Sequence, residues 1–525
     1  MDERGQAAVG DVGDVGDVGE AGEAGDVGEA HQPSWVRHAG WGLLGAQLLV
    51  MLVFSTVQYS RFALTEDFAN YSQAWWGIGH GHLDPYITGL GVPFWRDNAE
   101  FILWPLALLG RVYPHPVTLL WVQDLVVVAT ELVAFRWILD AIGRSRGRIP
   151  DWSGPLLGVG AAVALVANPW VYDTIAFDFH FEPIAALFCV LVGYNLWAGR
   201  FRHLWWWVPL ALVSHVLAGT YLVGIGLSGI VAGRRTRRPG VVIAAVGLVW
   251  TFVFTAVGAA GVRGEFVTKS YGYLLGPHPG NAGMVNVMAG AFTHPGAVLQ
   301  VADSHWTVVV AFLVVVGAVG VLSPWGAGMA LVVMVPNILD NTGLFIRPGA
   351  SFQSWPAMPF ILVGSVMVLL RLFEGDGRRR RLAAVILVVW ATVLGELSVL
   401  DLPTIPGSWI VVDRAAAAVL TQVAASVPAD AEVIASQGIV GRFAQRESVY
   451  DFRSGGETFP VDRKLVVFVF GPPDPYEKPL TPSLITAVSG YVHHRLGARV
   501  LRSRSGVHAY AWSPRPGTTT VTLPR

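Results

Sequence analysis

Apolar runs of about 20 residues recur along most of this chain, and short clusters of arginine separate several of them. An α-helix rises about 1.5 Å per residue, so a run of about 20 apolar residues crosses the roughly 30 Å hydrocarbon core of a bilayer. Only 14% of the residues are charged and the mean hydropathy is +0.50, whereas soluble domains carry about 25% charged residues. These features predict a polytopic helical membrane protein.

The chain divides into three parts by composition. Residues 1–33 repeat Asp-Val-Gly and Glu-Ala-Gly, which cannot bury enough apolar surface to fold, so we expect a disordered acidic cytoplasmic tail. Residues 34–400 form the predicted transmembrane domain, with outer loops at 61–115 and 261–305. Residues 401–525 lack long apolar blocks and show strand and helix patterns, which predicts a small α/β domain. Expected spans lie at about 39–60, 116–142, 154–171, 182–198, 203–233, 240–260, 306–322, 325–341, 355–371 and 382–400.

The arginine clusters predict how these spans are oriented, because basic loops favour the cytoplasmic side. If every apolar run crossed the membrane, the cluster at Arg144–Arg148 would lie on the opposite side from the N-terminus. Two assignments place every cluster on one side: 98–113 is an interfacial or re-entrant helix, and 203–233 is a helical hairpin with its turn at Ser214-His215. The predicted fold is therefore mainly α, a bundle of about 11 spans with a cytoplasmic N-terminus and an extracytoplasmic C-terminal α/β domain.

This topology places a dense polar motif, Phe177-Asp178-Phe179-His180-Phe181-Glu182-Pro183, on the outer side. In a strand Asp178, His180 and Glu182 would share one face, and in a helix Asp178 and Glu182 would. Carboxylate and imidazole ligands suit a divalent cation such as Mg²⁺ or Mn²⁺, so these three residues are candidate metal ligands. The alternative is that Glu182-Pro183 simply opens a helix, where an acid is favoured.

Other outer loops add candidates for catalysis and binding. Asp67, in Thr65-Glu66-Asp67-Phe68 just after the first span, is a candidate general base or metal partner; the alternative is an interfacial helix with solvated acids. Arg347 could hold a phosphate bidentately, or it could balance nearby acids. His215 could be a hydrogen-bonded interior histidine. The substrate-binding candidates are Glu100, His215, Lys269, Tyr271 and Arg347.

Two acids interrupt the predicted span 116–142. Asp124 and Glu131 lie two helical turns apart, so they share a face that should point into the bundle. Alternatively, Arg136 pairs with one of them. Acids at this depth favour a transporter, whereas the clustering of polar groups in the outer loops favours an enzyme. The single cysteine, Cys189, excludes a disulfide framework, and basic residues gather in short loops, so we expect no nucleic-acid partner.

Three stretches carry a resemblance to a known family: Thr65-Glu66-Asp67-Phe68 with Gln73-Ala74-Trp75, the motif at 177–183, and Val427-Pro428-Ala429-Asp430-Ala431. Over about 40–512 the chain resembles an uncharacterised family of predicted bacterial polytopic membrane proteins. That family in turn resembles the GT-C superfamily of polyprenyl-phosphate-sugar glycosyltransferases. The resemblance implies that Asp67 acts as base or positions a metal, that 177–183 forms a second outer motif, and that a helical-hairpin turn lies near residue 215.

These observations favour a GT-C-like glycosyltransferase of the plasma membrane. We expect it to move a sugar from a polyprenyl-phosphate donor to an extracytoplasmic acceptor, with the bilayer and the donor lipid as partners and a divalent cation as a cofactor. The alternative is a non-catalytic lipid-binding or polymer-binding membrane protein, or a transporter subunit. The residues do not specify the donor sugar or the acceptor.

Overall fold

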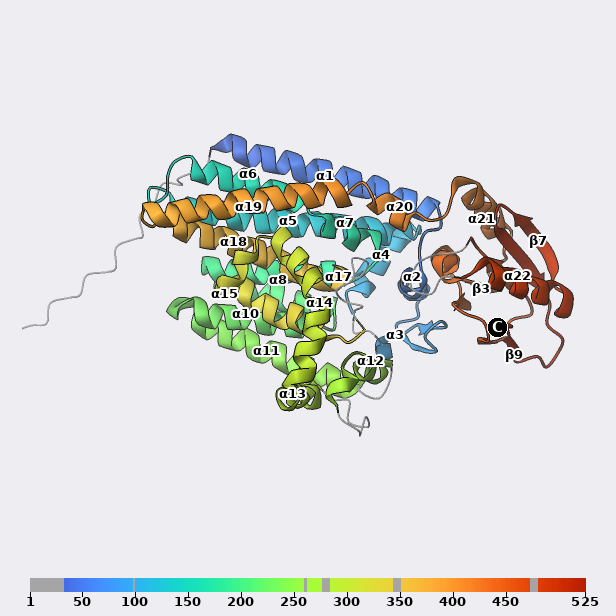
Figure 1. The fold of residues 1–525 in the computed structure, drawn as a ribbon. Coiled ribbons are helices and arrows are strands. Elements are labelled where there is room, and N and C mark those ends of the chain that lie inside the picture. The colour runs from blue at the N-terminus through green and yellow to red at the C-terminus, as the bar shows by residue number, and fades with distance from the viewer. Residues whose placement is uncertain (1–32, 98–99, 259–261, 276–283, 343–350, 473–479) are drawn as a thin grey trace, which may run out of the picture.

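A computed structural model describes residues 33–97, 100–258, 262–275, 284–342, 351–472 and 480–525. A bundle of long helices forms one end of the molecule and a smaller domain with strands forms the other (Figure 1). Short helices of the first long loop lie between them. The expected acidic tail at 1–33 lies outside the described residues, apart from Pro33.

The bundle has a helix at each expected span position. By length and composition, six helical stretches could cross a membrane: Ser34–Ser60, Ser153–Ala176, Arg234–Phe254, Pro295–Val315, Phe352–Phe373 and Gly377–Asp401. Shorter apolar helices lie at Glu182–Ala198, Ala218–Ala232 and Pro324–Leu339. With α5 (Val117–Ser145) and α9 (Phe201–Ser214), these match the eleven expected positions in the described part of the chain. The other bundle helices are α1 (Ser34–Ser60), α6 (Ser153–Val166), α7 (Pro169–Ala176), α8 (Glu182–Ala198), α10 (Ala218–Ala232), α11 (Arg234–Gly258), α14 (Pro295–Val315), α15 (Pro324–Met329), α16 (Val335–Leu339), α18 (Met358–Phe373) and α19 (Gly377–Asp401).

Helices α9 and α10 form the expected hairpin. The run breaks at His215, which has extended backbone angles and lies beside Glu182 at the start of α8. At the other end, the Arg235 guanidinium lies 5.8 Å from the ring of Phe201, where α9 begins. The two arms therefore run in opposite directions between these two ends.

The arginine clusters meet at one end of the bundle. Arg144 lies 3.7 Å over the ring of Trp197, which ends α8. Arg148 forms an ion pair with Glu374 at 3.2 Å, just before the arginine run that opens α19. The polar motif at 177–183 lies at the opposite end, next to the smaller domain (Figure 1). The arginine clusters and the polar motif therefore lie at opposite ends of the bundle, as the charge pattern predicted.

The first long loop folds over the end of the bundle that carries the polar motif at 177–183. Its helices are α2 (Glu66–Gly79), α3 (Phe94–Asp97) and α4 (Leu103–Val112), with a hairpin of β1 (Tyr86–Ile87) and β2 (Val92–Pro93). Ten residues of α4 span about 15 Å, half of a bilayer core, so α4 cannot cross it. Trp75 of α2 donates to the Leu106 carbonyl, and Leu108, Leu109 and Val112 are exposed. This matches the expected interfacial or re-entrant helix.

The C-terminal domain is built on a five-stranded sheet in the order β4-β3-β6-β8-β7. Strands β3 (Glu432–Ser436), β4 (Val449–Phe452) and β6 (Val466–Phe470) are parallel, and β8 (Val507–Trp512) and β7 (Arg499–Arg504) continue it antiparallel. Separate hydrophobic clusters cover its two faces, one with α21 (Arg414–Ser426) and one with α22 (Pro482–Gly490). Strands β5 (Thr458–Pro460) and β9 (Thr520–Thr522) form a second small sheet. The expected α/β domain is present.

A buried polar seam runs between α1 and α5. The Ser55 hydroxyl donates to Asp124 at 3.1 Å, and the Gln47 amide donates to Glu131 at 3.4 Å. Both acids are buried and face the bundle, as their spacing predicted. Arg136 pairs with Asp140 at 3.1 Å, so the alternative pairing of Arg136 with Asp124 or Glu131 is wrong.

Candidate functional site

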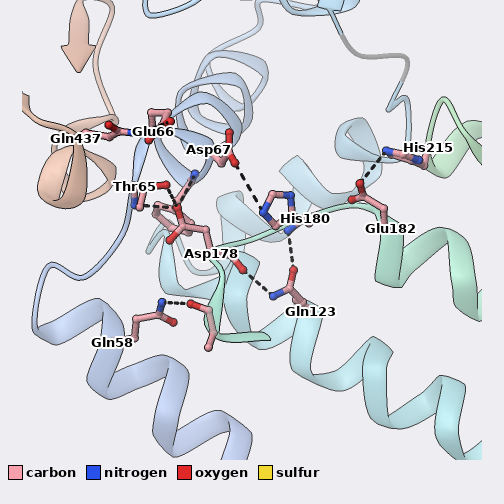
Figure 2. Close-up of polar contacts among 12 residues, drawn as sticks. Gln58, Thr65, Glu66, Asp67, Gln123, Asp178, His180, Glu182, His215 and Gln437 are labelled. Atoms are coloured by element: carbon pink, nitrogen blue, oxygen red, sulfur yellow. Dashed lines mark hydrogen bonds and ion pairs between the residues drawn. The ribbon is translucent and has the colours of Figure 1, made fainter. Parts of the chain in front are cut away.

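The loop at 177–181 is fixed by two buried glutamines. Gln123 of α5 donates to the Asp178 carbonyl at 2.8 Å and accepts from the His180 amide at 2.6 Å. Gln58 of α1 donates to the Ala176 carbonyl at 2.6 Å. Figure 2 shows both amides reaching this loop from the two helices. Since buried backbone groups need partners, these contacts define the path of the loop between α7 and α8.

Asp178 holds the start of α2 rather than a common metal centre. One carboxylate oxygen accepts from the Thr65 amide at 2.8 Å, the Thr65 hydroxyl at 2.5 Å and the Phe68 amide at 3.3 Å. These donors belong to Thr65, the N-cap residue of α2, and to Phe68 in its first turn, and α2 has no side-chain cap of its own. Asp178 has φ of 55°, a left-handed conformation that Asp tolerates better than most residues. Burial raises the pKa of its carboxyl to about 7, against the effect of these hydrogen bonds.

Asp67 and His180 face each other across a short gap. The Asp67 carboxylate lies 3.9 Å from His180 Nε2, and its side chain is 39% exposed while that of His180 is buried (Figure 2). Burial lowers the pKa of His180 to about 3, so its ring is neutral at pH 7. Its Nε2 has no hydrogen-bond partner among the described residues, so the bond with the Phe177 carbonyl is made by Nδ1–H. The neutral ring therefore presents a lone pair toward a carboxylate.

Aromatic rings hold the His180 imidazole in place. Phe352, from α17 (Ser351–Ser354), stacks on it with ring centroids 3.7 Å apart, and Phe177 stacks at 5.2 Å. Tyr71 of α2 meets it edge-on at 6.1 Å. These contacts fix the plane of the ring, so the direction in which Nε2 points is set by packing.

A second polar cluster brings together three residues from distant loops. His215 Nε2 lies 3.5 Å from Glu100 and 3.6 Å from Glu182, and all three residues are buried. The Leu217 amide donates to His215 Nδ1 at 3.2 Å, so a neutral His215 carries its proton on Nε2, facing both carboxylates. Glu182 begins α8, as the helix-opening alternative expected, and it also faces this cluster.

The three expected metal ligands do not share one centre. Asp178 faces α2, His180 faces Asp67 and Glu182 faces His215. In the described residues, no group of three or more histidine, cysteine, aspartate or glutamate side chains is placed to hold a metal ion. The residues present therefore do not fit the divalent cation that the motif suggested, and no step below is derived through a metal.

The C-terminal domain packs directly on α2. Gln437 donates to Glu66 at 2.6 Å, and Gln73 donates to the carbonyls of Arg446 and Glu447 at 3.1 Å each. Arg453 lies 3.6 Å from the same Glu66 oxygen. Asp67 follows Glu66 in the first turn of α2, so it lies at the boundary between the bundle and this domain.

The remaining candidates lie away from these clusters. Lys269 is exposed on α12 (Val262–Tyr271), and the Tyr271 hydroxyl donates to the Pro336 carbonyl at 3.2 Å, which ties this loop to the bundle. Arg347 lies outside the described residues. The sequence did not lead us to predict the roles of Gln58 and Gln123. Each is a polar side chain within a predicted span, which indicates a buried hydrogen-bond partner and could have identified both residues.

Comparison with known proteins gives one family and similar solved structures. A family model described as "Predicted membrane protein (DUF2079)" matches residues 61–477. The crystal structure of ArnT from Cupriavidus metallidurans bound to undecaprenyl phosphate is similar at 13% identity and a TM-score of 0.48, covering 90% of this chain and 98% of that chain. At these values the likeness carries no argument about activity. No curated protein matches.

Proposed function

We propose a function for this chain as a member of the DUF2079 family of predicted membrane proteins, to which it belongs because the family model matches 61–477. The membership expected from the sequence motifs is thereby confirmed. The proposed function is a membrane-embedded glycosyltransferase that moves a sugar from a polyprenyl-phosphate donor to a hydroxyl group of an acceptor outside the cytoplasm.

One observation carries the proposal: two hydrogen-bond acceptors face each other at Asp67 and His180. A carboxylate and the lone pair of a neutral imidazole, 3.9 Å apart, are too far for a direct hydrogen bond and have no proton of their own to share. A hydrogen-bond donor placed between them could contact both the carboxylate and the imidazole lone pair. A hydroxyl group entering this gap would find a general base already in place.

The proposed reaction assigns one role to each of these residues. Asp67 takes the proton of the acceptor hydroxyl while His180 orients that hydroxyl. The acceptor oxygen forms a bond to the anomeric carbon of the sugar, and the bond from that carbon to the phosphate oxygen breaks. The leaving group is polyprenyl phosphate, and Asp67 gives up its proton to solvent through its exposed side.

The setting of the site supports a lipid-linked donor. Asp67 and His180 lie where the apolar bundle meets the polar C-terminal domain (Figures 1 and 2). An amphiphilic donor could keep its chain in the bilayer and present its sugar there. The donor class itself rests on the resemblance of the motifs at 65–75 and 177–183 to the GT-C superfamily.

The second candidate function is a transporter subunit, and the seam of Asp124 and Glu131 favours it. Both acids lie inside the bundle, and one oxygen of each has no hydrogen-bond partner among the described residues. Intramembrane acids commonly mark ion or proton pathways. A transporter would depend on these acids and not on Asp67.

The test is a transfer assay with the full chain purified in detergent and polyprenyl-phosphate sugars as donors. Asp67→Asn should lower the rate by about 10²-fold or more, the usual contribution of a general base. Asp84→Asn is the matched control, since Asp84 lies in the same loop and, among the described residues, accepts a hydrogen bond from the Trp95 amide alone. Equal release of polyprenyl phosphate by wild type and Asp67→Asn refutes the assignment. No transfer by wild type, together with solute or proton flux in proteoliposomes that is lost in Asp124→Asn, supports the transporter instead.

The orientation is part of the proposal and has its own test. The arginine end of the bundle should face the cytoplasm and the C-terminal domain should lie outside. Cys189 is buried, so a Cys189→Ala background lets single exposed cysteines be labelled. In intact cells a membrane-impermeant maleimide should label Ser503→Cys and not Arg146→Cys. The reverse pattern overturns the orientation.

A further inference from the structure

The last part of the chain is basic and contains no acid. From Lys478 to Arg525 the sequence has no aspartate or glutamate, while the whole chain has a net charge of −1. Four arginines fall within ten residues, at 495, 499, 502 and 504. Three of them lie on β7, the edge strand of the five-stranded sheet.

A β-bulge places these three arginines on one face. Regular alternation would send Arg499 to one face of β7 and Arg502 and Arg504 to the other. The pairing with β8 shifts between Val500 and Arg502, so Leu501 is the extra residue. As a result Arg499, Arg502 and Arg504 lie opposite Ala511, Ala509 and Val507, which alternate along β8 and share a face. From the sequence we expected basic residues to gather in short loops; this basic row was not predicted, because regular alternation would place its members on different faces.

The three arginines are exposed and have no acidic partner. None of them forms an ion pair with another described residue; Arg502 donates to the Gln422 amide oxygen at 3.5 Å and to the neighbouring Leu501 carbonyl at 2.9 Å. Helix α21, which packs on this face, has no acid between Arg414 and Ser426. Charged residues commonly protect an edge strand from pairing. That role does not require three charges of one sign on one face with no acid beside them.

We propose that the β7 row, Arg499, Arg502 and Arg504, binds a linear polymer of phosphodiester-linked units. Arginine presents a planar fork that matches phosphate oxygens bidentately. Arg502 and Arg504 are two strand residues apart, roughly 7 Å, comparable to the separation of successive phosphates in an extended phosphodiester chain. The row is therefore suited to a repeating phosphate backbone. This inference does not depend on the glycosyltransferase assignment, but it rests on the proposed orientation, in which the C-terminal domain lies outside the membrane.

The position of β7 selects a polymer rather than a lipid surface. Strand β7 forms the edge of the C-terminal domain that lies farthest from the helical bundle (Figure 1). Headgroups of the membrane that holds the bundle lie at the other side of this domain. A soluble chain outside the membrane can reach the row, whereas those headgroups cannot.

The experiment measures binding of a fluorescent glycerol-phosphate oligomer to the full chain in detergent, by anisotropy at several salt concentrations. Replacing all three arginines with alanine should weaken binding about tenfold or more at low salt. Each phosphate contact contributes roughly 0.7 to the slope of log affinity against log salt, so loss of three contacts should reduce that slope by about 2. Replacing all three with lysine keeps the charge and fold, and should bind more weakly than wild type but more tightly than the alanine variant.

A matched control removes the same charge elsewhere. Arg378, Arg379 and Arg381 are exposed at the start of α19, at the other end of the molecule, and their triple alanine variant should bind the oligomer like wild type. Equal weakening in both triple variants, or none in the β7 variant, overturns the proposal. So does binding of a polyglutamate chain as tight as that of the oligomer. Preferential binding of phosphatidylglycerol vesicles in place of the oligomer overturns it in favour of a lipid surface.

Discussion

Replacing Asp178 with alanine should release the first turn of α2. The substitution leaves the Thr65 and Phe68 amides without the oxygen that accepts from both. An unsatisfied buried donor costs about 1–3 kcal/mol, and loss of an N-terminal cap costs about 0.5–2 kcal/mol. Alanine also tolerates the left-handed backbone at this position less well than aspartate. Since these contributions overlap, we expect a loss of about 3 kcal/mol.

The assay is amide hydrogen exchange of α2 followed by mass spectrometry. If opening of this turn is local, a loss of about 3 kcal/mol speeds exchange of the peptide that contains Thr65 and Phe68 by about 10²-fold. Asp178→Asn is the control, because it keeps an oxygen acceptor and the tolerance for positive φ, and should exchange within about fivefold of wild type. Wild-type exchange in Asp178→Ala would refute the view that this carboxyl holds α2. Equal acceleration in both variants would show that the charge matters and not the acceptor.

The same carboxyl predicts a pH dependence with a defined sign. Burial raises the pKa of Asp178 to about 7, whereas opening of α2 exposes it to water, where its pKa returns to about 4. The closed form therefore binds the proton more tightly, and its stability falls as pH rises from about 4 to about 7 and then levels off. After correction for the intrinsic pH dependence of exchange, Asp178→Asn should lack this trend.

Three further predictions concern other buried polar contacts. Gln123→Leu leaves two backbone groups of the loop at 177–181 without partners and should lower the stability by about 2–4 kcal/mol, seen as a lower thermal transition temperature in detergent. Gln123→Glu keeps the accepting contact and should lower the stability by less. An unchanged transition temperature in both variants would show that Gln123 does not hold this loop. Gln73→Ala should loosen the C-terminal domain and speed proteolysis between α19 and α21, whereas Gln422→Ala, which removes only an exposed contact with Arg502, should not. Ser55→Ala should destabilise the bundle by about 1–3 kcal/mol, because Asp124 loses its hydrogen-bond donor. In an Asp124→Asn background the same substitution should destabilise the bundle by less. Equal destabilisation in both backgrounds would contradict a direct contact between the two side chains.

Charge and length were enough to predict the architecture of the bundle. The arginine clusters required 98–113 to stay at the interface and 203–233 to turn back, and the structure has a short α4 and a break at His215. The C-terminal strands followed from apolar runs such as 466–470, which are buried on both faces. These features depend on burial and on charge sorting, which a sequence shows directly.

The arrangement of the site depends on tertiary contacts that a sequence does not show. The alternation of Asp178, His180 and Glu182 suggested one shared face, but the left-handed residue at Asp178 turns the three side chains toward different partners. Glu100, His215 and Glu182 come from three loops, and no spacing predicted that they meet. Likewise, the β7 row depends on one extra residue at Leu501, which reverses the alternation.

Helix α2 is anchored at both of its sides, and this links the two ends of the molecule thermodynamically. Asp178 of the bundle holds its first turn, while Gln73 and Glu66 contact the C-terminal domain. A ligand that shifts α2 from either side changes the affinity felt at the other side by the same factor, since coupling between two binding equilibria is reciprocal. If a ligand bound at the C-terminal domain shifts α2, its occupancy would therefore change binding at Asp67, and occupancy of the Asp67–His180 gap would change binding at the C-terminal domain, with one helix as the shared element.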